Sequence, residues 1–318
     1  MEKQEEETKM NRTEFCKELC RLVLEGLGEG YQTEISQVQK NNGVLKEVVH
    51  VRKESSEGIP CFYMDELYHS YLDGECVDGM AEYLVNIVRG ECERVRRDAR
   101  KYLEKEWITG HLFLRLIHLD KNRDTLSGAV YRAFLDLAAV VYVLVEDSKD
   151  NVKSFRLPAY MWEGLGVGTI EEYFPKIVKN TERLFPARLS CMGHMASECI
   201  LHGNEDGMPR FEAVQPEQEL SAHRLYILSN RRRINGAAVL LYPEMLRRLG
   251  RQFLGDYYII PSSVHEVLLL KKTGEEDEEL LNRTVCNVNE KQVVPEERLA
   301  EHIYYYSVAA EKLYGDRV

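Results

Sequence analysis

Two serines and a histidine stand close together in the apolar stretch PSSVHEVLLL, at positions Ser262, Ser263 and His265. Side chains two residues apart on a strand share a face, so Ser263 and His265 can lie side by side. A hydroxyl beside an imidazole is how a nucleophile is paired with its general base, which suits a hydrolase. The same spacing suits a turn in which serine binds the backbone and histidine binds a neighbouring carbonyl. We favour the turn and keep the hydrolase as the alternative, with Glu266 pointing to the opposite face.

A second group has residue types that suit zinc: Cys191, His194, Cys199 and His202. The pattern predicts one helix over 188–202. At about 1.5 Å of rise per residue, its first and last ligands would lie roughly 16 Å apart, too far for one ion. We therefore predict a packed helix, no metal site and no cofactor.

The chain turns basic at Arg231, Arg232 and Arg233, just before Asn235. Between 221 and 272 there are nine basic and three acidic residues, against an acidic background. This asymmetry predicts an acidic or phosphate-bearing partner at the basic face of 224–272. Neutralisation of acidic residues within the molecule explains it equally well, so both interpretations stay open. The predicted binding residues are Arg231, Arg232, Arg233, Asn235, Ser262, Ser263, His265 and Glu266.

Asp136 interrupts the apolar run FLDLAAVVYVLV at 134–145. A carboxylate placed there must be paired or protonated if it is buried. Arg115 and Arg132 are the expected partners. The glycines of 164–168 lack the lysine of a phosphate-binding loop, so we expect a turn or a helix end.

Composition excludes several classes of function. The 318 residues contain 42 Lys and Arg against 53 Asp and Glu, a formal net charge of -11. A chain this acidic disfavours general nucleic-acid or anionic-membrane binding. No apolar stretch approaches the roughly 20 residues of a membrane span. Eight cysteines follow no disulfide framework, so we expect reduced thiols and a cytoplasmic protein.

The elements that must position these residues fall into three parts. Residues 1–10 form an acidic leader that we expect to be disordered, and Met10 is an alternative start. Residues 11–107 predict a helix–hairpin–helix unit, with Asn41, Asn42 and Gly43 at the hairpin turn and a long helix from 77 to 107.

Residues 108–318 predict a larger body. From 224 to 270 the pattern reads as a strand, the basic turn, a strand at AAVLLY, a helix and two strands. The last two, 256–260 and 264–270, flank a tight turn at 261–263. The fold class is α+β, with a mixed, mostly antiparallel sheet body, flanking helices and a small N-terminal α/β unit. Core or near-core residues are expected at Ile259, Ile260, Val264, Val267 and Leu269.

Several segments resemble an uncharacterised bacterial family, domain-of-unknown-function family 5688, found mostly in anaerobic gut Gram-positive bacteria. The similarity covers about residues 10 to 310, and His118 stands where it leads us to expect Asn. The strand–helix–strand part also looks faintly like another uncharacterised bacterial family, numbered 1444. Neither resemblance implies a reaction or a cofactor. The segments are KNNGV at 40–44, RLIH at 115–118, FLDLAAVVYVLV at 134–145, NTERLFPA at 180–187, YILSN at 226–230, NGAAVLLYPEML at 235–246, PSSVHEVLLL at 261–270 and VNEKQVVPEERLAEHIYYY at 288–306.

The sequence favours a non-catalytic binding or interaction protein, with a partner held against the 224–270 face. The alternative is a hydrolase that uses Ser263 and His265, with Arg115 or Asp136 nearby. The substrate, the partner and the oligomeric state do not follow from the sequence.

Overall fold

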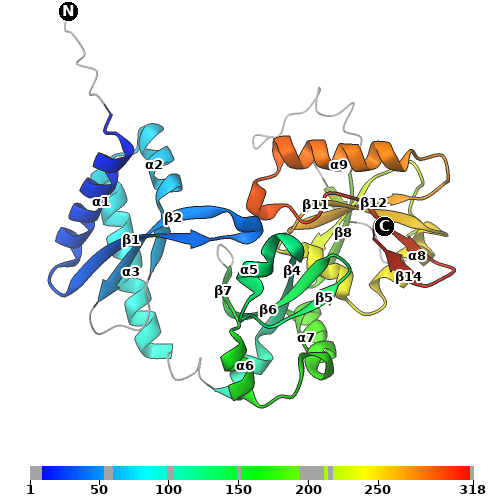
Figure 1. Ribbon diagram of the computed structural model, residues 1–318, viewed down its shortest axis with the longest axis horizontal. Helices are drawn as coiled ribbons and strands as arrows, with labels where there is room; N and C mark the ends of the chain where they lie inside the picture. Colours follow the sequence, from blue (N-terminus) through cyan, green and yellow to red (C-terminus); the bar gives the residue numbers. More distant parts are fainter. Residues whose placement is uncertain are drawn as a thin grey trace, which may run out of the picture. The chain divides into compact units, whose positions relative to one another are not determined.

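The computed structural model describes residues 9–53, 60–98, 104–148, 152–192, 211–213 and 218–315 (Figure 1). The chain divides into two compact units. The first comprises residues 1–40 and 44–104, and the second comprises residues 41–43 and 105–318. Among the described residues, helices accompany three sheets whose strands all pair antiparallel, which confirms the predicted α+β class.

The first unit packs three helices with a small sheet of order β1-β2-β3. Its first helix begins with a capping box, in which Asn11 and Glu14 satisfy each other's backbone N–H groups. Gly26 lets the helices approach closely, because a Cβ there would lie 2.8 Å from Cγ2 of Val85. The elements are α1 (Arg12–Leu27), β1 (Tyr31–Gln39), β2 (Leu45–Lys53), β3 (Cys61–Tyr63), α2 (Met64–Leu72) and α3 (Val77–Asp98).

The second unit contains a four-stranded sheet, in which β6 pairs with β4, β5 and β7, and a seven-stranded sheet of order β14-β13-β11-β12-β10-β8-β9. Its helices and short 3-10 turns are η1 (Asn41–Gly43), α4 (Lys105–Gly110), η3 (Asp120–Asn122), α5 (Arg123–Leu126), α6 (Ala159–Leu165), α7 (Ile170–Leu184), η4 (Gly236–Leu241), α8 (Met245–Phe253), α9 (Glu278–Gln292) and η5 (Pro295–Glu297). Its strands are β4 (Leu112–His118), β5 (Tyr131–Phe134), β6 (Leu137–Asp147), β7 (Val152–Arg156), β8 (Ala187–Met192), β9 (Phe211–Ala213), β10 (Tyr226–Asn230), β11 (Tyr257–Ser263), β12 (Glu266–Lys271), β13 (Tyr304–Ser307) and β14 (Lys312–Tyr314).

Strand β6 is covered on both faces. Leu137, Ala139 and Val141 face the main core, whereas Ala138 and Val140 face a second cluster. A strand buried on both sides has no polar face, which explains why 137–144 reads as a continuous apolar run. The main core also takes side chains from both sheets, α7 and α8.

The predicted strand at AAVLLY is wrong, because residues 236–241 form the 3-10 helix η4. Gly236, Ala237, Ala238, Val239 and Leu240 are all buried. A short apolar run that is buried all round has no period that separates strand from helix.

The predicted turn at 261–263 is also wrong. Pro261 and Ser263 belong to β11, and the turn consists of Val264 and His265. Proline is tolerated there because β11 pairs with β13 only through Tyr257–Ile259 and its ladder to β12 is bulged between Pro261 and Ser263. The core prediction is confirmed at Ile259, Val264, Val267 and Leu269, while Ile260 is half-buried.

Two predicted helices also differ from the structure. The start of the predicted helix 188–202 is strand β8, which ends at Met192, and residues 193–210 lie outside the described residues. Helix α3 is described to Asp98, and a separate helix, α4, begins at Lys105. The hairpin turn is confirmed, with positive φ at Asn42 and Gly43.

We expect Gly236→Ala to destabilise the fold. A Cβ there would lie 2.1 Å from Oγ of Ser229 and 2.4 Å from the carbonyl oxygen of His265. Overpacking of this kind typically lowers the free energy of unfolding by about 1–3 kcal/mol. Gly164→Ala in α6 is the control. No atom lies within 4 Å of its added Cβ, so it should raise stability by roughly 0.5–1 kcal/mol. Thermal or urea unfolding measures both variants. The same melting temperature or urea midpoint for the two would contradict this packing.

Candidate functional site

The β11–β12 turn holds His265 by three contacts. Its backbone N–H donates to Oγ of Ser263 at 3.0 Å, and its Nδ1 accepts the N–H of Asn235 at 3.1 Å. Its Nε2 lies 3.2 Å from Oε1 of Glu297. Since Nδ1 accepts a proton donor, Nε2 carries the proton that faces the carboxylate.

This geometry leaves no base for a serine nucleophile. Both ring nitrogens of His265 are engaged, and Ser263 contacts the backbone of His265 instead of its ring. Ser262 is the extra residue at the β11 bulge, and Glu266 pairs with Ser263 across the ladder. A nucleophile needs hydrogen-bond contact with its base, so these groups complete a turn.

The basic turn is built by Asn230, which is buried. Its Oδ1 accepts the N–H of Arg232 at 3.0 Å, and its Nδ2 donates to the carbonyl of Ile234 at 2.8 Å. Arg232 turns inward, with Nε 3.2 Å from Asp147, and donates to the carbonyl of Ser148. Arg231 and Arg233 are exposed. Asn235 has a left-handed backbone conformation.

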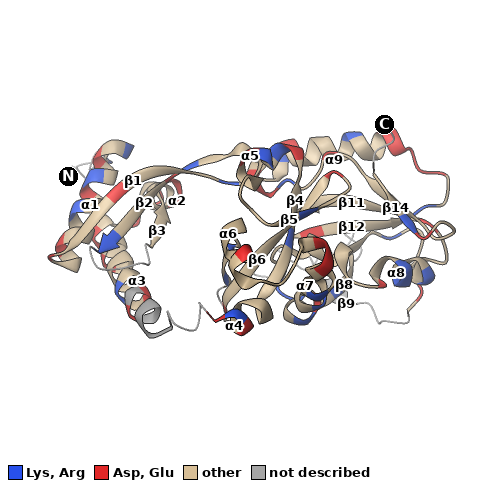
Figure 2. Cartoon of the chain, turned by 60° about the horizontal axis from the view of Figure 1, so that its bottom comes forward, with Lys and Arg blue, Asp and Glu red and all other residues tan. Residues whose placement is uncertain are grey.

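The remaining basic residues of 224–272 do not gather beside this turn. Because β10 and β12 run antiparallel, Tyr226 pairs with Leu269, so Arg224 and Lys271 lie at the opposite end of the strands from Arg231. Lys272 bonds to Glu278. On α8, Arg247 bonds to Glu244 and Glu311. Figure 2 shows both signs of charge interspersed over the helices. An acidic partner at Arg231 and Arg233 stays a prediction.

Of the four residues with zinc-binding side chains, one lies in the described part of the chain. Cys191 is buried in β8, and His194, Cys199 and His202 lie outside the described residues. Within the described part of the chain, no three His, Cys, Asp or Glu side chains form a group that could hold a metal ion.

Asp136 is the centre of a polar cluster that sequence reasoning missed. It lies in the two-residue turn between β5 and β6, and its Oδ1 accepts the hydroxyl of Tyr304 at 2.7 Å. Its Oδ2 lies 3.0 Å from Nε2 of His302 and 3.9 Å from Nε2 of His118. The expected pairing with Arg115 or Arg132 is wrong: Arg115 stacks on Tyr142 and bonds to Ser154, and Arg132 stacks on Phe174.

The cluster sets the charge state of its members. Partial burial works to raise the pKa of Asp136, but the hydrogen bonds from His302 and Tyr304 outweigh it and hold that pKa below its ordinary value. Burial, and then the nearby carboxylate, raise the pKa of Tyr304. Burial lowers the pKa of His118 although Asp136 opposes this. Near neutral pH, Asp136 is therefore ionised while Tyr304 and His118 are neutral.

The imidazole nitrogens of this cluster are already used. Nδ1 of His302 lies 3.0 Å from the carbonyl oxygen of Ile303, and Nδ1 of His118 accepts the N–H of Lys121 at 3.3 Å. Both Nε2 atoms face Asp136. The cluster thus joins the β5–β6 turn to β13, with no ring nitrogen directed at a substrate position.

A buried asparagine adds further hydrogen bonds near this connection between the β5–β6 turn and β13. Asn122 donates to Oδ1 of Asn42 at 2.9 Å and to the carbonyl of His118 at 2.7 Å. Asn42, which belongs to the second unit, donates in turn to the carbonyls of Pro295 and Arg298. The segment from η5 to β13 is therefore held by backbone and side-chain bonds along its length.

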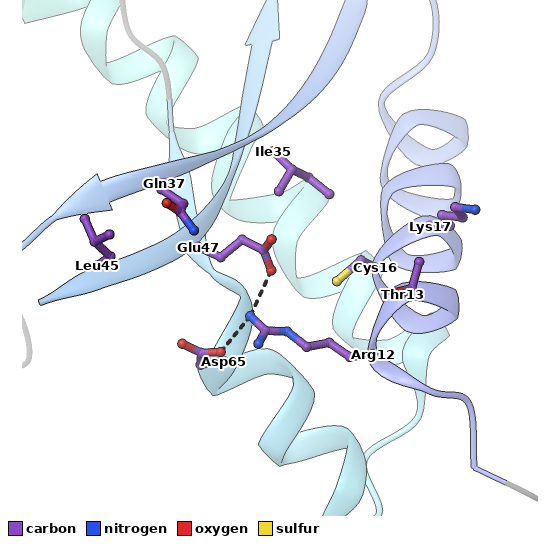
Figure 3. A pocket seen from close by; sticks show the side chains of 9 residues that line it. All are labelled: Arg12, Thr13, Cys16, Lys17, Ile35, Gln37, Leu45, Glu47 and Asp65. Atoms are coloured by element: carbon purple, nitrogen blue, oxygen red, sulfur yellow. Dashed lines mark hydrogen bonds and ion pairs between the residues drawn. The ribbon is translucent and has the colours of Figure 1, made fainter.

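The first unit contains a cavity of about 440 Å³ between α1, the β1–β2 hairpin and the start of α2 (Figure 3). Two apolar side chains of its lining are exposed, Ile35 at 44% and Leu45 at 59%. No catalytic motif marks this place in the sequence. The available signal was the alternation of β1, in which an isoleucine stands among polar residues. The lining consists of Arg12, Thr13, Cys16, Lys17, Ile35, Gln37, Leu45, Glu47 and Asp65.

Charge in this cavity is held in place by Arg12. Its Nη2 lies 2.8 Å from Glu47 and 2.7 Å from Asp65, and Figure 3 shows it between the two carboxylates. Burial, and then the charge of Glu47, raise the pKa of Cys16. A thiol with a raised pKa is a poor nucleophile. The cavity therefore offers apolar contact and hydrogen bonds without an activated group.

A family model matches residues 12–308, and its description is a family of unknown function, DUF5688. The chain belongs to this family. No curated protein and no solved structure matches the chain. Within the described part of the DUF5688 protein, no helix combines the length and apolar character needed to cross a membrane.

We expect Asp136→Asn to lower the free energy of unfolding by about 1–3 kcal/mol at neutral pH, because charged hydrogen bonds in a half-buried site are lost. The folded state favours the ionised carboxylate, so this stabilisation is present above the ordinary pKa of about 4 and disappears as pH falls through the lower folded pKa. Denaturant melts from neutral to acid pH measure the gap between wild type and variant, which should narrow on acidification.

Asp120→Asn is the matched control, since this exposed carboxylate pairs only with Arg123 among its described ion pairs. It should change stability by less than about 0.5 kcal/mol. A gap for Asp136→Asn that stays constant with pH would contradict an ionised Asp136.

Proposed function

We propose that this protein is a non-catalytic binding protein. Its first unit holds a segment of a partner protein in the cavity between α1, the β1–β2 hairpin and the start of α2. The observation that supports this most directly is the pair of exposed apolar side chains, Ile35 and Leu45, in a cavity of about 440 Å³. This volume falls within the roughly 300–1,000 Å³ of typical ligand sites. Its fixed Arg12, flanked by carboxylates, supplies polar contacts at the rim.

The polar groups of the second unit support binding over catalysis. At His265 and at Asp136, each imidazole nitrogen is engaged with another group of the fold. Catalytic sites instead keep a base within reach of the substrate proton. These clusters stabilise turns that connect the strands.

The chemistry of the cavity favours a peptide segment as its occupant. Arg12 is neutralised by Glu47 and Asp65, and Figure 3 shows the remaining charged lining residue, Lys17, directed away from these three groups, which leaves little charge for an ionic metabolite. Thr13 and Gln37 offer neutral hydrogen-bonding groups beside Ile35 and Leu45. A peptide provides apolar side chains together with backbone donors and acceptors.

We further infer a cytoplasmic setting. In the described part of the chain, six cysteines are free and three of them are exposed: Cys61, Cys76 and Cys286. Exposed thiols persist in reducing compartments and are oxidised outside them.

We expect Ser263→Ala and His265→Ala to remain folded. Ser263→Ala loses one hydrogen bond and should cost roughly 1 kcal/mol, whereas His265→Ala loses two contacts and should cost more. A fluorophosphonate probe for serine hydrolases should leave the wild type unlabelled. Covalent labelling of Ser263 that disappears in His265→Ala would establish the hydrolase instead.

We expect Leu45→Asp to weaken peptide binding at the cavity. Linear peptides enriched from a displayed random library on the wild-type protein should lose binding by at least about tenfold, since burying a Leu side chain contributes about 1.5–3 kcal/mol. Leu280→Asp on α9 is the control, because Leu280 has a similar exposure, 55%, and lies outside the cavity. Enriched peptides that bind Leu45→Asp as well as wild type would overturn the proposed site.

A further inference from the structure

The sheet edges in the described part of the chain are protected, with one exception. Strands β3, β9 and β14 are only three residues long, β5 four and β7 five. The edge of β4 is covered by α7, where Thr181 accepts the N–H of Leu114 at 3.0 Å and Asn180 donates to the carbonyl of Leu112. Short or covered edges are how proteins prevent unwanted pairing.

Strand β1 is the exception. It is nine residues long, and none of its residues is buried. It contains no Lys, Arg or Pro, and its pairing with β2 runs through all nine residues without a bulge. In the described part of the chain, its backbone makes no hydrogen bond with a strand other than β2.

The backbone groups on this edge can be assigned from the hairpin. Lys40 N–H donates to the carbonyl of Val44 at 2.7 Å, which fixes the alternation of inward and outward groups. Every second residue back from Lys40 therefore bonds to β2, beginning with Val38. The residues between them, including Thr33, Ile35 and Gln37, direct their N–H and C=O groups outward.

We propose that β1 pairs antiparallel with β1 of a second copy of this chain, across a two-fold axis at Ile35. Ile35 is the middle residue of the strand and directs its backbone outward, so this register pairs all nine residues. A register centred on Thr33 or Gln37 pairs only the five residues 31–35 or 35–39. The result is one continuous six-stranded sheet, built from two first units. This interface goes beyond the proposed peptide site, because it is formed by the outward backbone groups of β1, although the side chain of Ile35 also lines the cavity.

The side chains of β1 are complementary to themselves in this register. Ile35 faces Ile35 of the second copy, and Thr33 faces Gln37. Glu34, the one charged side chain of the strand, faces Ser36, and Arg52 of its own copy neutralises it at 2.9 Å. No like charges stand directly opposite each other, which would destabilise a cross-strand pair.

Substituting Ile35 by residues of opposite charge tests this arrangement on the full-length protein. Wild type should be a concentration-dependent dimer in sedimentation velocity and native mass spectrometry. Ile35→Asp and Ile35→Lys should each be monomeric, because two like charges then meet at the axis. Mixing these two variants, one carrying a mass tag, should restore a one-to-one heterodimer, since opposite charges now face each other. Circular dichroism melts check that both variants fold.

Two results would overturn the proposal. One is a wild type that stays monomeric at high micromolar concentration, and the other is a mixture of the two variants that forms no heterodimer. Leu45→Asp separates this interface from the peptide site. It should keep the dimer and lose peptide binding, so either property can fail without the other.

Discussion

One carboxylate connects the two sheets of the second unit. Asp136 lies in the β5–β6 turn of the four-stranded sheet. Of the two residues that hold it, Tyr304 is the first residue of β13 in the seven-stranded sheet and His302 lies just before that strand. Tyr304 is almost fully buried, so removing the Asp136 side chain would leave its hydroxyl without this acceptor. The main core takes side chains from both of these sheets.

The same demand for satisfied polar groups explains why residues that resemble catalytic groups act as structural ones. Gly236 packs against the carbonyl of His265, and Ser229 donates to that carbonyl at 2.7 Å. The backbone N–H of Asn235 donates a hydrogen bond to Nδ1 of His265. A histidine held at both nitrogens is fixed in one tautomer and position, which stabilises the packing of η4 against β10 and β12.

The sequence predicts local structure well where its period is clear. The Asn42–Gly43 turn, the hairpin and the buried strands around Ile259 and Val267 follow from alternation and turn chemistry. It fails at 236–241, where complete burial removes the period, and at Pro261, where a bulge admits proline into a strand. Asp136 and His302 are 166 residues apart, so no local pattern could pair them. The expected arginines lay nearer in sequence but are held by aromatic rings.

The two units manage exposed polar backbone in different ways. The second unit covers or shortens its sheet edges, and side chains such as Thr181 and Asn180 of α7 bond to the exposed backbone of β4. The first unit has a small sheet whose edge strand β1 is nine residues long and pairs, in the described part of the chain, with β2 alone, beside a cavity. An edge of that kind pairs with any compatible strand. Under the proposed pairing, this edge would be buried against the same edge of a second copy. Backbone groups that the second unit satisfies within one chain would then be satisfied in the first unit between two chains.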